Sequence, residues 1–246
     1  MPVSQWELFR VEELTVWKFE TRVNRFVVRV SRGDAHAIAL LRNTGRLLEL
    51  RDGLSVLCAP KSRGKTSLLL VAAECEDGFV LLDTVTQSRA FEVAHSRGFL
   101  PWLGWRILRR EVTVDDSRLD YEIGKGRSRG YLELKSAALT EGTFASYPDC
   151  PSDRGAKHIR RLIEVASTGR RSVMLFIATN PRVTRFWPNW NADERICLSL
   201  VEAEAAGVEI RCMKAVLSAD GAVRLESPDI AVDLSRSRQD RPTGRP

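Results

Sequence analysis

The residues of this sequence best suited to chemistry are two carboxylates and a lysine. Asp120, Glu133 and Lys135 lie in the stretch SRLDYEIGKGRSRGYLELK. Carboxylate oxygens are good ligands for Mg²⁺ and Mn²⁺. A lysine beside the metal can orient a water molecule and stabilise developing negative charge. The set therefore predicts a catalytic site for metal-assisted phosphodiester hydrolysis, with Asp120 and Glu133 as metal ligands.

Two neighbouring strands are needed to bring this set together. Glu133 and Lys135 are two residues apart, so a strand over residues 130–137 would place both on one face. Asp120 lies in an extended segment over residues 109–123, and the turn GKGRSRG joins the two segments. If Asp120 pairs opposite Glu133, the carboxylates share a face, whereas a slip of one residue separates them.

A third acid, Glu111, precedes Asp120 on the same extended segment and is predicted as a further metal ligand. The alternative for all of these residues is a set of solvated charges on a half-exposed strand. The pattern D-x₁₂-E-x-K does not by itself distinguish the two interpretations.

A helix with a basic face is predicted after the second of these strands. Ser152 can cap a helix that runs to about residue 168, with Gly169 as its stop signal. The basic side chains on its first turns lie three or four residues apart and share a face: Arg154, Lys157, His158 and Arg161. We expect this face to contact phosphates, with Lys157 or His158 able to lie beside the metal site, the alternative being an exposed cationic stripe.

A second basic cluster, APKSRGKT over residues 59–66, approximates a phosphate-binding loop with alanine in place of the first glycine. Such a loop must leave a strand and open a helix, yet the following SLLLVAAE is typical of a strand. The favoured interpretation is a β-hairpin loop whose Lys61, Arg63 and Lys65 contact a phosphate backbone by charge.

The hydrophobic pattern changes near residue 85. Before it, short alternating runs such as VNRFVVRV (23–30) are separated by Gly and Asp turns, which favours a small barrel or sandwich. After it, a helix over residues 87–97, a fully apolar strand over 172–178 and a helix ending at Gly207 predict an α/β layer arrangement.

Composition excludes several classes of protein. Hydrophobic residues make up 43% of the 246 residues, enough to bury a core, and no apolar run is long enough to span a bilayer. The first residues lack the order of a secretory signal, so we expect a cytoplasmic protein without membrane contact.

Half of the net charge of +6 lies in the last twelve residues, which we expect to be disordered. The six tryptophans are expected in the core or, alternatively, as base-stacking residues. The sequence leaves the oligomeric state open, a homodimer included.

Several long stretches resemble the sugar fermentation stimulation protein A (SfsA) family. They occur in family order, as RVNRFVVRV (22–30), NTGRLLEL (43–50), SRLDYE to YLELKSAALTEG (117–142), YPDCPSDRGAKHIRRL (147–162), RFWPNWNADE (185–194) and EAEAAGVEI (202–210). The resemblance implies an OB-fold-like β-barrel over residues 1–85, an α/β domain resembling PD-(D/E)xK nucleases over 86–230, and a basic tail over 231–246.

The same resemblance implies DNA binding and assigns the nuclease core to Asp120, Glu133 and Lys135. The predicted function is therefore a DNA-binding protein with an Mg²⁺- or Mn²⁺-dependent nuclease site. The alternative is a non-catalytic DNA-binding regulator of sugar-utilisation genes that retains the fold. The chain departs from the family where Leu40 and Arg42 replace the usual His and Pro before Asn43-Thr44-Gly45. That tripeptide can also be explained as a turn with a capping asparagine.

Overall fold

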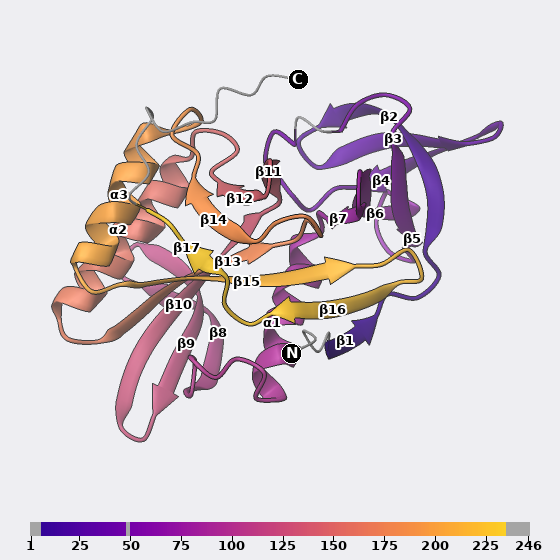
Figure 1. The fold of residues 1–246 in the computed structure, drawn as a ribbon. Coiled ribbons are helices and arrows are strands. Elements are labelled where there is room, and N and C mark those ends of the chain that lie inside the picture. The colour runs from indigo at the N-terminus through magenta and orange to yellow at the C-terminus, as the bar shows by residue number, and fades with distance from the viewer. Residues whose placement is uncertain (1–5, 48–49, 235–246) are drawn as a thin grey trace.

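The first domain is a closed five-stranded barrel (Figure 1). The structure is a computed structural model that describes residues 6–47 and 50–234. The strands of this domain are β2 (Thr15–Asn24), β3 (Val27–Arg32), β4 (Ala35–Leu40), β5 (Ser55–Pro60), β6 (Leu68–Cys75) and β7 (Gly78–Leu81). A parallel pairing of β4 with β6 closes the barrel, and β7 extends it beside β6. This is the expected OB-fold-like architecture.

The expected strand over residues 23–30 is interrupted by a turn. β2 ends at Asn24 and β3 begins at Val27, so that Arg25 and Phe26 form the hairpin tip. The Asn24 side chain accepts a hydrogen bond from the Phe26 amide at 2.9 Å, which is the local turn chemistry that asparagine favours. Beyond the turn, Val28 and Val30 point into the barrel core as the alternation predicts.

The second domain is built on a seven-stranded mixed sheet. Its strands, in spatial order, are β1 (Trp6–Arg10), β16 (Ala222–Ser227), β15 (Glu209–Leu217), β13 (Arg171–Ala178), β10 (Ser128–Ala137), β9 (Ser117–Lys125) and β8 (Arg106–Val114). The central strands β10, β13 and β15 are parallel, and the flanking pairs are antiparallel.

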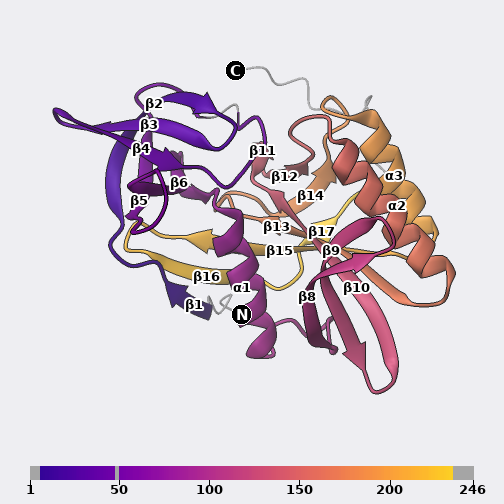
Figure 2. The ribbon, with the colours of Figure 1, turned by 180° about the vertical axis from the view of Figure 1, so that it is seen from behind.

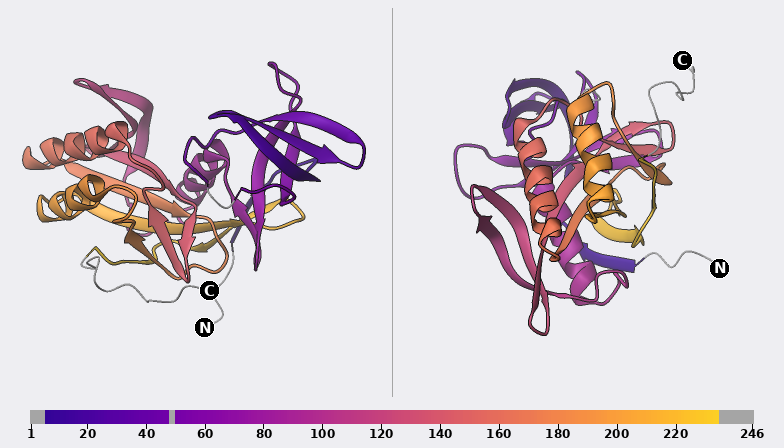
Figure 3. Two further views of the ribbon diagram at one scale, coloured as in Figure 1. Left: turned by 90° about the horizontal axis from the view of Figure 1, so that it is seen from above. Right: turned by 90° about the vertical axis from the view of Figure 1, so that its left-hand side faces the viewer.

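Helices cover both faces of this sheet (Figures 1 and 2). They are α1 (Thr84–Ser96), α2 (Asp153–Ser167) and α3 (Glu194–Ala205). Helix α1 packs in one core, whereas α2 and α3 share the other core and lie side by side (Figure 3). Alternate residues of β13 enter the two cores, which explains why its sequence is apolar without interruption.

Helix boundaries follow capping side chains. Ser152 accepts a hydrogen bond from the Gly155 amide at the start of α2, as predicted. Asp193 caps α3, and Asp83 caps α1 by accepting from the Thr86 amide. Because of the cap at Asp83, α1 begins three residues earlier than the expected helix over 87–97.

The structure differs from the expected domain limits at both ends. Strand β1 lies before the barrel in the chain but pairs with β16 of the large sheet, so it is not a barrel strand. A second, four-stranded sheet consists of β11 (Leu139–Glu141), β12 (Phe144–Tyr147), β14 (Arg185–Pro188) and β17 (Ala231–Val232). β17 belongs to the segment expected as a tail, whereas residues 235–246 lie outside the described part of the chain.

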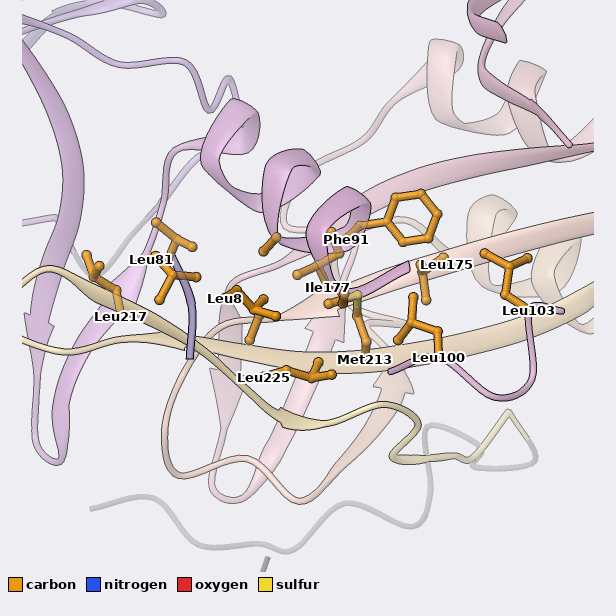
Figure 4. Packing of buried hydrophobic residues seen from close by; sticks show 14 of the residues in the cluster. Leu8, Leu81, Phe91, Leu100, Leu103, Leu175, Ile177, Met213, Leu217 and Leu225 are labelled. Carbon is orange, nitrogen blue, oxygen red and sulfur yellow. The ribbon is translucent and has the colours of Figure 1, made fainter. Parts of the chain in front are cut away.

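One hydrophobic core joins the two domains (Figure 4). Leu81 at the end of the barrel packs in the same cluster as Leu8, Phe91 and Leu217 of the second domain. The contact makes the barrel and the large sheet one packed body. Among the described residues, no helix combines the length and hydropathy required to cross a membrane.

Candidate active site

The two predicted carboxylates meet where strands β9 and β10 stop pairing through their backbones. The ladder between the strands runs to the pair Leu132–Tyr121, and its continuation places Glu133 opposite Asp120. At that point hydrogen bonds from backbone amides to the two carboxylates replace the hydrogen bonds between the backbones of the strands. The Asp120 amide donates to Glu133 Oε2 at 3.2 Å, and the Leu134 amide donates to Asp120 Oδ2 at 2.7 Å. The structure therefore brings both carboxylates together, in the register that the sequence left open.

Lys135 and His158 complete the cluster. The Lys135 ammonium lies 2.5 Å from Glu133 Oε1, and His158 Nδ1 contacts the same oxygen. Arg154 donates from Nε to His158 Nε2 at 3.4 Å, which leaves the ring proton on Nδ1 facing Glu133. Sequence reasoning allowed His158 a phosphate contact or a place beside the metal site, and the structure buries it against the Glu133 carboxylate.

The electrostatics of the two carboxylates differ. Burial, followed by the negative charge of Glu133, raises the pKa of Asp120 to about 6. Burial also acts to raise the pKa of Glu133, but the charge of Lys135 and the hydrogen bond with His158 outweigh it and lower that pKa. Burial acts against the charged form of Lys135, yet the adjacent Glu133 carboxylate raises its pKa, which keeps the ammonium protonated. The site thus holds one well-compensated carboxylate and one that lacks a nearby cation of its own.

A cleft of about 450 Å³ opens over these residues between the two domains. Its floor includes Asp120, Glu133 and Lys135, and Arg154 lies at its side. The opposite wall is barrel sequence, formed by Arg25 and by the loop that follows β4. Residues of both domains therefore line the space above the carboxylates.

The barrel loop at this wall is the Asn43-Thr44-Gly45 segment. Asn43 Oδ1 accepts from the Gly45 amide, so the asparagine does cap a turn. Arg22 braces the loop by donating to the Gly45 carbonyl at 2.5 Å. A Cβ at position 45 would lie 1.9 Å from Asp149 Oδ2, so a larger residue would have to displace this side chain of the second domain.

Arg42, which replaces the family proline, fixes the junction between the domains. Its guanidinium donates to both oxygens of the fully buried Asp83, at 2.5 Å and 2.7 Å. Its carbonyl accepts from the Thr84 hydroxyl at 3.1 Å. Arg42 therefore ties the loop after β4 to the start of α1. Leu40, which replaces the family histidine, is half-buried in β4.

The basic face of α2 divides into two parts. Arg154 lines the cleft, and His158 is buried against the Glu133 carboxylate. Lys157 and Arg161 instead bind the β8–β9 turn, with contacts of 3.0 Å and 2.8 Å to the Asp116 carboxylate. This division was not predictable from the local pattern, because the acidic turn lies about forty residues earlier in the chain.

Two other predicted groups lie away from the cluster. Glu111 is opposite Asp120 by register, but its backbone is left-handed with φ 53°, and its exposed carboxylate pairs with Arg118 at 2.5 Å. Lys61, Arg63 and Lys65 lie on the loop between antiparallel β5 and β6, outside the cleft lining. The segment over residues 59–66 is thus a hairpin loop and does not open a helix.

The residues present fit a single divalent cation that keeps part of its water shell. Within residues 6–47 and 50–234, no three His, Cys, Asp or Glu side chains converge on one point. Mg²⁺ needs only one or two carboxylates when waters and substrate phosphate complete its shell. Asp120 Oδ1 accepts no hydrogen bond from the described residues and lines an open cleft, so it can serve as such a ligand.

Comparisons with known proteins agree with the fold. Residues 21–82 match the model of the SfsA N-terminal OB domain, and residues 85–221 match that of the sugar fermentation stimulation protein RE domain. A sugar fermentation stimulation protein homolog of Pyrococcus furiosus is 42% identical over 209 residues, covering 84% of this chain and 91% of that protein. One of Archaeoglobus fulgidus is 41% identical over 227 residues, covering 92% and 99%. A solved structure of Pyrococcus furiosus SfsA in complex with Ca²⁺ superposes with a TM-score of 0.90 at 40% identity, covering 93% of this chain and 99% of that chain. The chain belongs to the SfsA family.

Proposed function

We propose that this protein binds DNA and hydrolyses its phosphodiester bonds at Asp120, Glu133 and Lys135, using Mg²⁺ or Mn²⁺. The observation that carries the proposal is the pair of adjacent carboxylates at the floor of the interdomain cleft. Burial, followed by the neighbouring charge of Glu133, raises the pKa of Asp120, so ionising this carboxylate destabilises the folded chain unless a cation offsets the cost. Such a cost is expected at a functional site.

The metal ligands in this proposal are Asp120 Oδ1 and Glu133 Oε2. A divalent cation bound there supplies polarisation of the phosphate and a more acidic water molecule. The Ca²⁺ of the Pyrococcus furiosus SfsA structure supports a preference of the family for hard cations with oxygen ligands. Glu133 Oε1 is already bonded to Lys135 and His158, so these two side chains fix the orientation of the carboxylate.

The protein side chains then have separate roles. Lys135 holds its ammonium at the cleft floor, where it can orient a water molecule and stabilise negative charge on the phosphate. His158 positions Glu133, and Arg154 offers its guanidinium to a backbone phosphate at the side of the cleft. Lys61, Arg63 and Lys65 provide a further phosphate contact on the barrel. Lys157 and Arg161 contribute weakly because Asp116 already pairs with both.

The experiment is a cleavage assay on end-labelled single-stranded and double-stranded DNA with Mn²⁺ or Mg²⁺, and with EDTA as a blank. We expect cleavage that needs the metal and that falls at least about 100-fold in Asp120→Asn and in Lys135→Ala. Glu111→Gln is the matched carboxylate control and should retain activity within about twofold, because its partner is Arg118.

Cleavage that survives in both site variants would contradict the proposed site. DNA binding by the wild-type protein, without cleavage under any of these conditions, would instead support the non-catalytic regulator. The assay therefore separates the two functions that the sequence allows.

A further inference from the structure

Phe26 has an unusual position for an aromatic side chain. Within residues 6–47 and 50–234, it is the one aromatic residue among the exposed large apolar side chains, with 47% of its surface accessible. The six tryptophans are all buried or partly buried, so none of them is exposed as Phe26 is. An exposed phenylalanine contributes little to the barrel core and leaves a face of its ring available for stacking.

The turn that carries Phe26 is held rigidly. The Phe26 amide donates to Asn24 Oδ1 at 2.9 Å, and its carbonyl accepts from the Leu41 amide at 2.8 Å. The Arg25 carbonyl accepts from Arg22 at 3.0 Å, the same guanidinium that braces the Asn43-Thr44-Gly45 loop. The ring is therefore presented by a fixed backbone that is hydrogen-bonded to the wall of the cleft.

Arg25 connects the ring to the cleft. Its guanidinium carbon lies 5.1 Å from the centre of the Phe26 ring, and the same side chain lines the cleft above the carboxylates. A cation on one face of an aromatic ring, beside a path lined by basic groups, is the arrangement that single-strand-binding proteins use. The base stacks on the ring while the phosphates follow the positive charge.

We propose that Phe26 and Arg25 form a base-stacking platform that admits an unpaired strand of DNA to the cleft. In a duplex the faces of the bases are covered by their neighbours, so only an unpaired base can stack on Phe26. The next phosphates of that strand then pass between Arg25 and Arg154 towards Asp120. This inference rests on the proposed function, and it assigns single-stranded DNA, or a frayed end, as the substrate.

The test measures binding in EDTA, so that it does not depend on cleavage. The probes are a fluorescein-labelled thymidine homopolymer, the same strand made fully abasic, and a blunt duplex. We expect Phe26→Ala to weaken binding to the homopolymer about tenfold. Val23→Ala removes a side chain of similar exposure, 52%, on the same hairpin and should change it less than twofold. Phe26→Trp should bind at least as tightly as the wild type.

The abasic strand separates stacking from charge. It should bind the wild type and Phe26→Ala equally, because it has phosphates but no bases. Equal losses for Phe26→Ala and Val23→Ala, an unchanged affinity in Phe26→Ala, or tighter binding of the blunt duplex would each overturn the platform. A protein that binds all three probes as expected but never cleaves would contradict only the proposed nuclease activity.

Discussion

Asp83 and Asp120 are two aspartates at the junction of the domains, and their surroundings differ sharply. Asp83 is fully buried and accepts from the Arg42 guanidinium, the Thr86 amide and the Thr86 hydroxyl. Asp120 accepts one hydrogen bond from the Leu134 amide and lies beside a second carboxylate, Glu133. The Asp83 carboxylate is paired with an arginine and fully hydrogen-bonded, whereas the Asp120 carboxylate has no ion pair with a cation among the described residues.

The difference separates stabilising from functional charge. A buried carboxylate with a bidentate arginine and a helix cap holds the fold together. A buried carboxylate beside a second negative charge raises the free energy of the folded state. Such a cost is expected at a functional site, where a bound ligand can offset it. Three tests of this division follow. The first predicts a loss of stability, the second a gain of stability, and the third a smaller dependence of DNA affinity on salt.

Removing the satisfied carboxylate should cost the most. Asp83→Ala deletes the cap of α1 and leaves the Arg42 guanidinium without its partner, so we expect a loss of about 3–5 kcal/mol in the free energy of unfolding. Urea denaturation measures the loss. Asp83→Asn is the control because it keeps a capping oxygen, and its loss should be smaller. A change below about 1 kcal/mol in Asp83→Ala would show that the junction does not depend on this pair.

Removing the unsatisfied carboxylate should have the opposite effect on stability. The pKa of Asp120 rises from 3.8 to about 6 on folding, so the folded state favours the protonated form. The cost of ionising it grows as the pH rises through this interval and is complete above it, by about 2–3 kcal/mol. Asp120→Asn should therefore be more stable than the wild type at pH near 7.5 without metal, and the difference should vanish at pH near 4.

Thermal unfolding at the two pH values, with EDTA present, measures this difference. Added Mn²⁺ should then stabilise the wild type but not Asp120→Asn. A variant that is less stable than the wild type at both pH values would mean that Asp120 has a structural role like that of Asp83.

The smallest effect is expected for the basic residues of α2, and it concerns the salt dependence of DNA binding. On this helix too, one charged residue is paired with protein groups and another faces the cleft. Arg154 faces the cleft, whereas the Lys157 ammonium already binds the Asp116 carbonyl at 2.7 Å and its carboxylate at 3.0 Å. Arg154→Ala should lower the slope of log affinity for DNA against log salt by about one, and Lys157→Ala should lower it less. Equal slopes in the two variants would contradict the division.

Local pattern predicted the elements well. The apolar run of β13 and the cap at Ser152 gave correct predictions of a doubly buried strand and of the start of α2. Alternation along β10 correctly placed Glu133 and Lys135 on one side. These features depend on neighbouring residues in the chain, which the sequence contains.

Distant pairings were not predictable in the same way. The pairing of β1 with β16 joins the two ends of the described chain, and nothing local in Trp6–Arg10 specifies it. The pairing of Lys157 with the acidic turn at Asp116 was not predictable either, because the two are far apart in the chain. Phe26 was misassigned because VNRFVVRV alternates well enough to suggest one continuous strand, and only the Asn24 side chain hints at a turn. The proximity of Asp120, Glu133 and Lys135 was thus predictable, but the cleft that they line was not.

The central claim is that Asp120 and Glu133 bind a divalent cation, and anomalous diffraction from crystals soaked in Mn²⁺ tests it directly. The account predicts an anomalous peak within bonding distance of an oxygen from each carboxylate, and no such peak in crystals of Asp120→Asn. A map with no peak at these carboxylates, or with Mn²⁺ bound only at another acidic site such as Asp115 and Asp116, would contradict it.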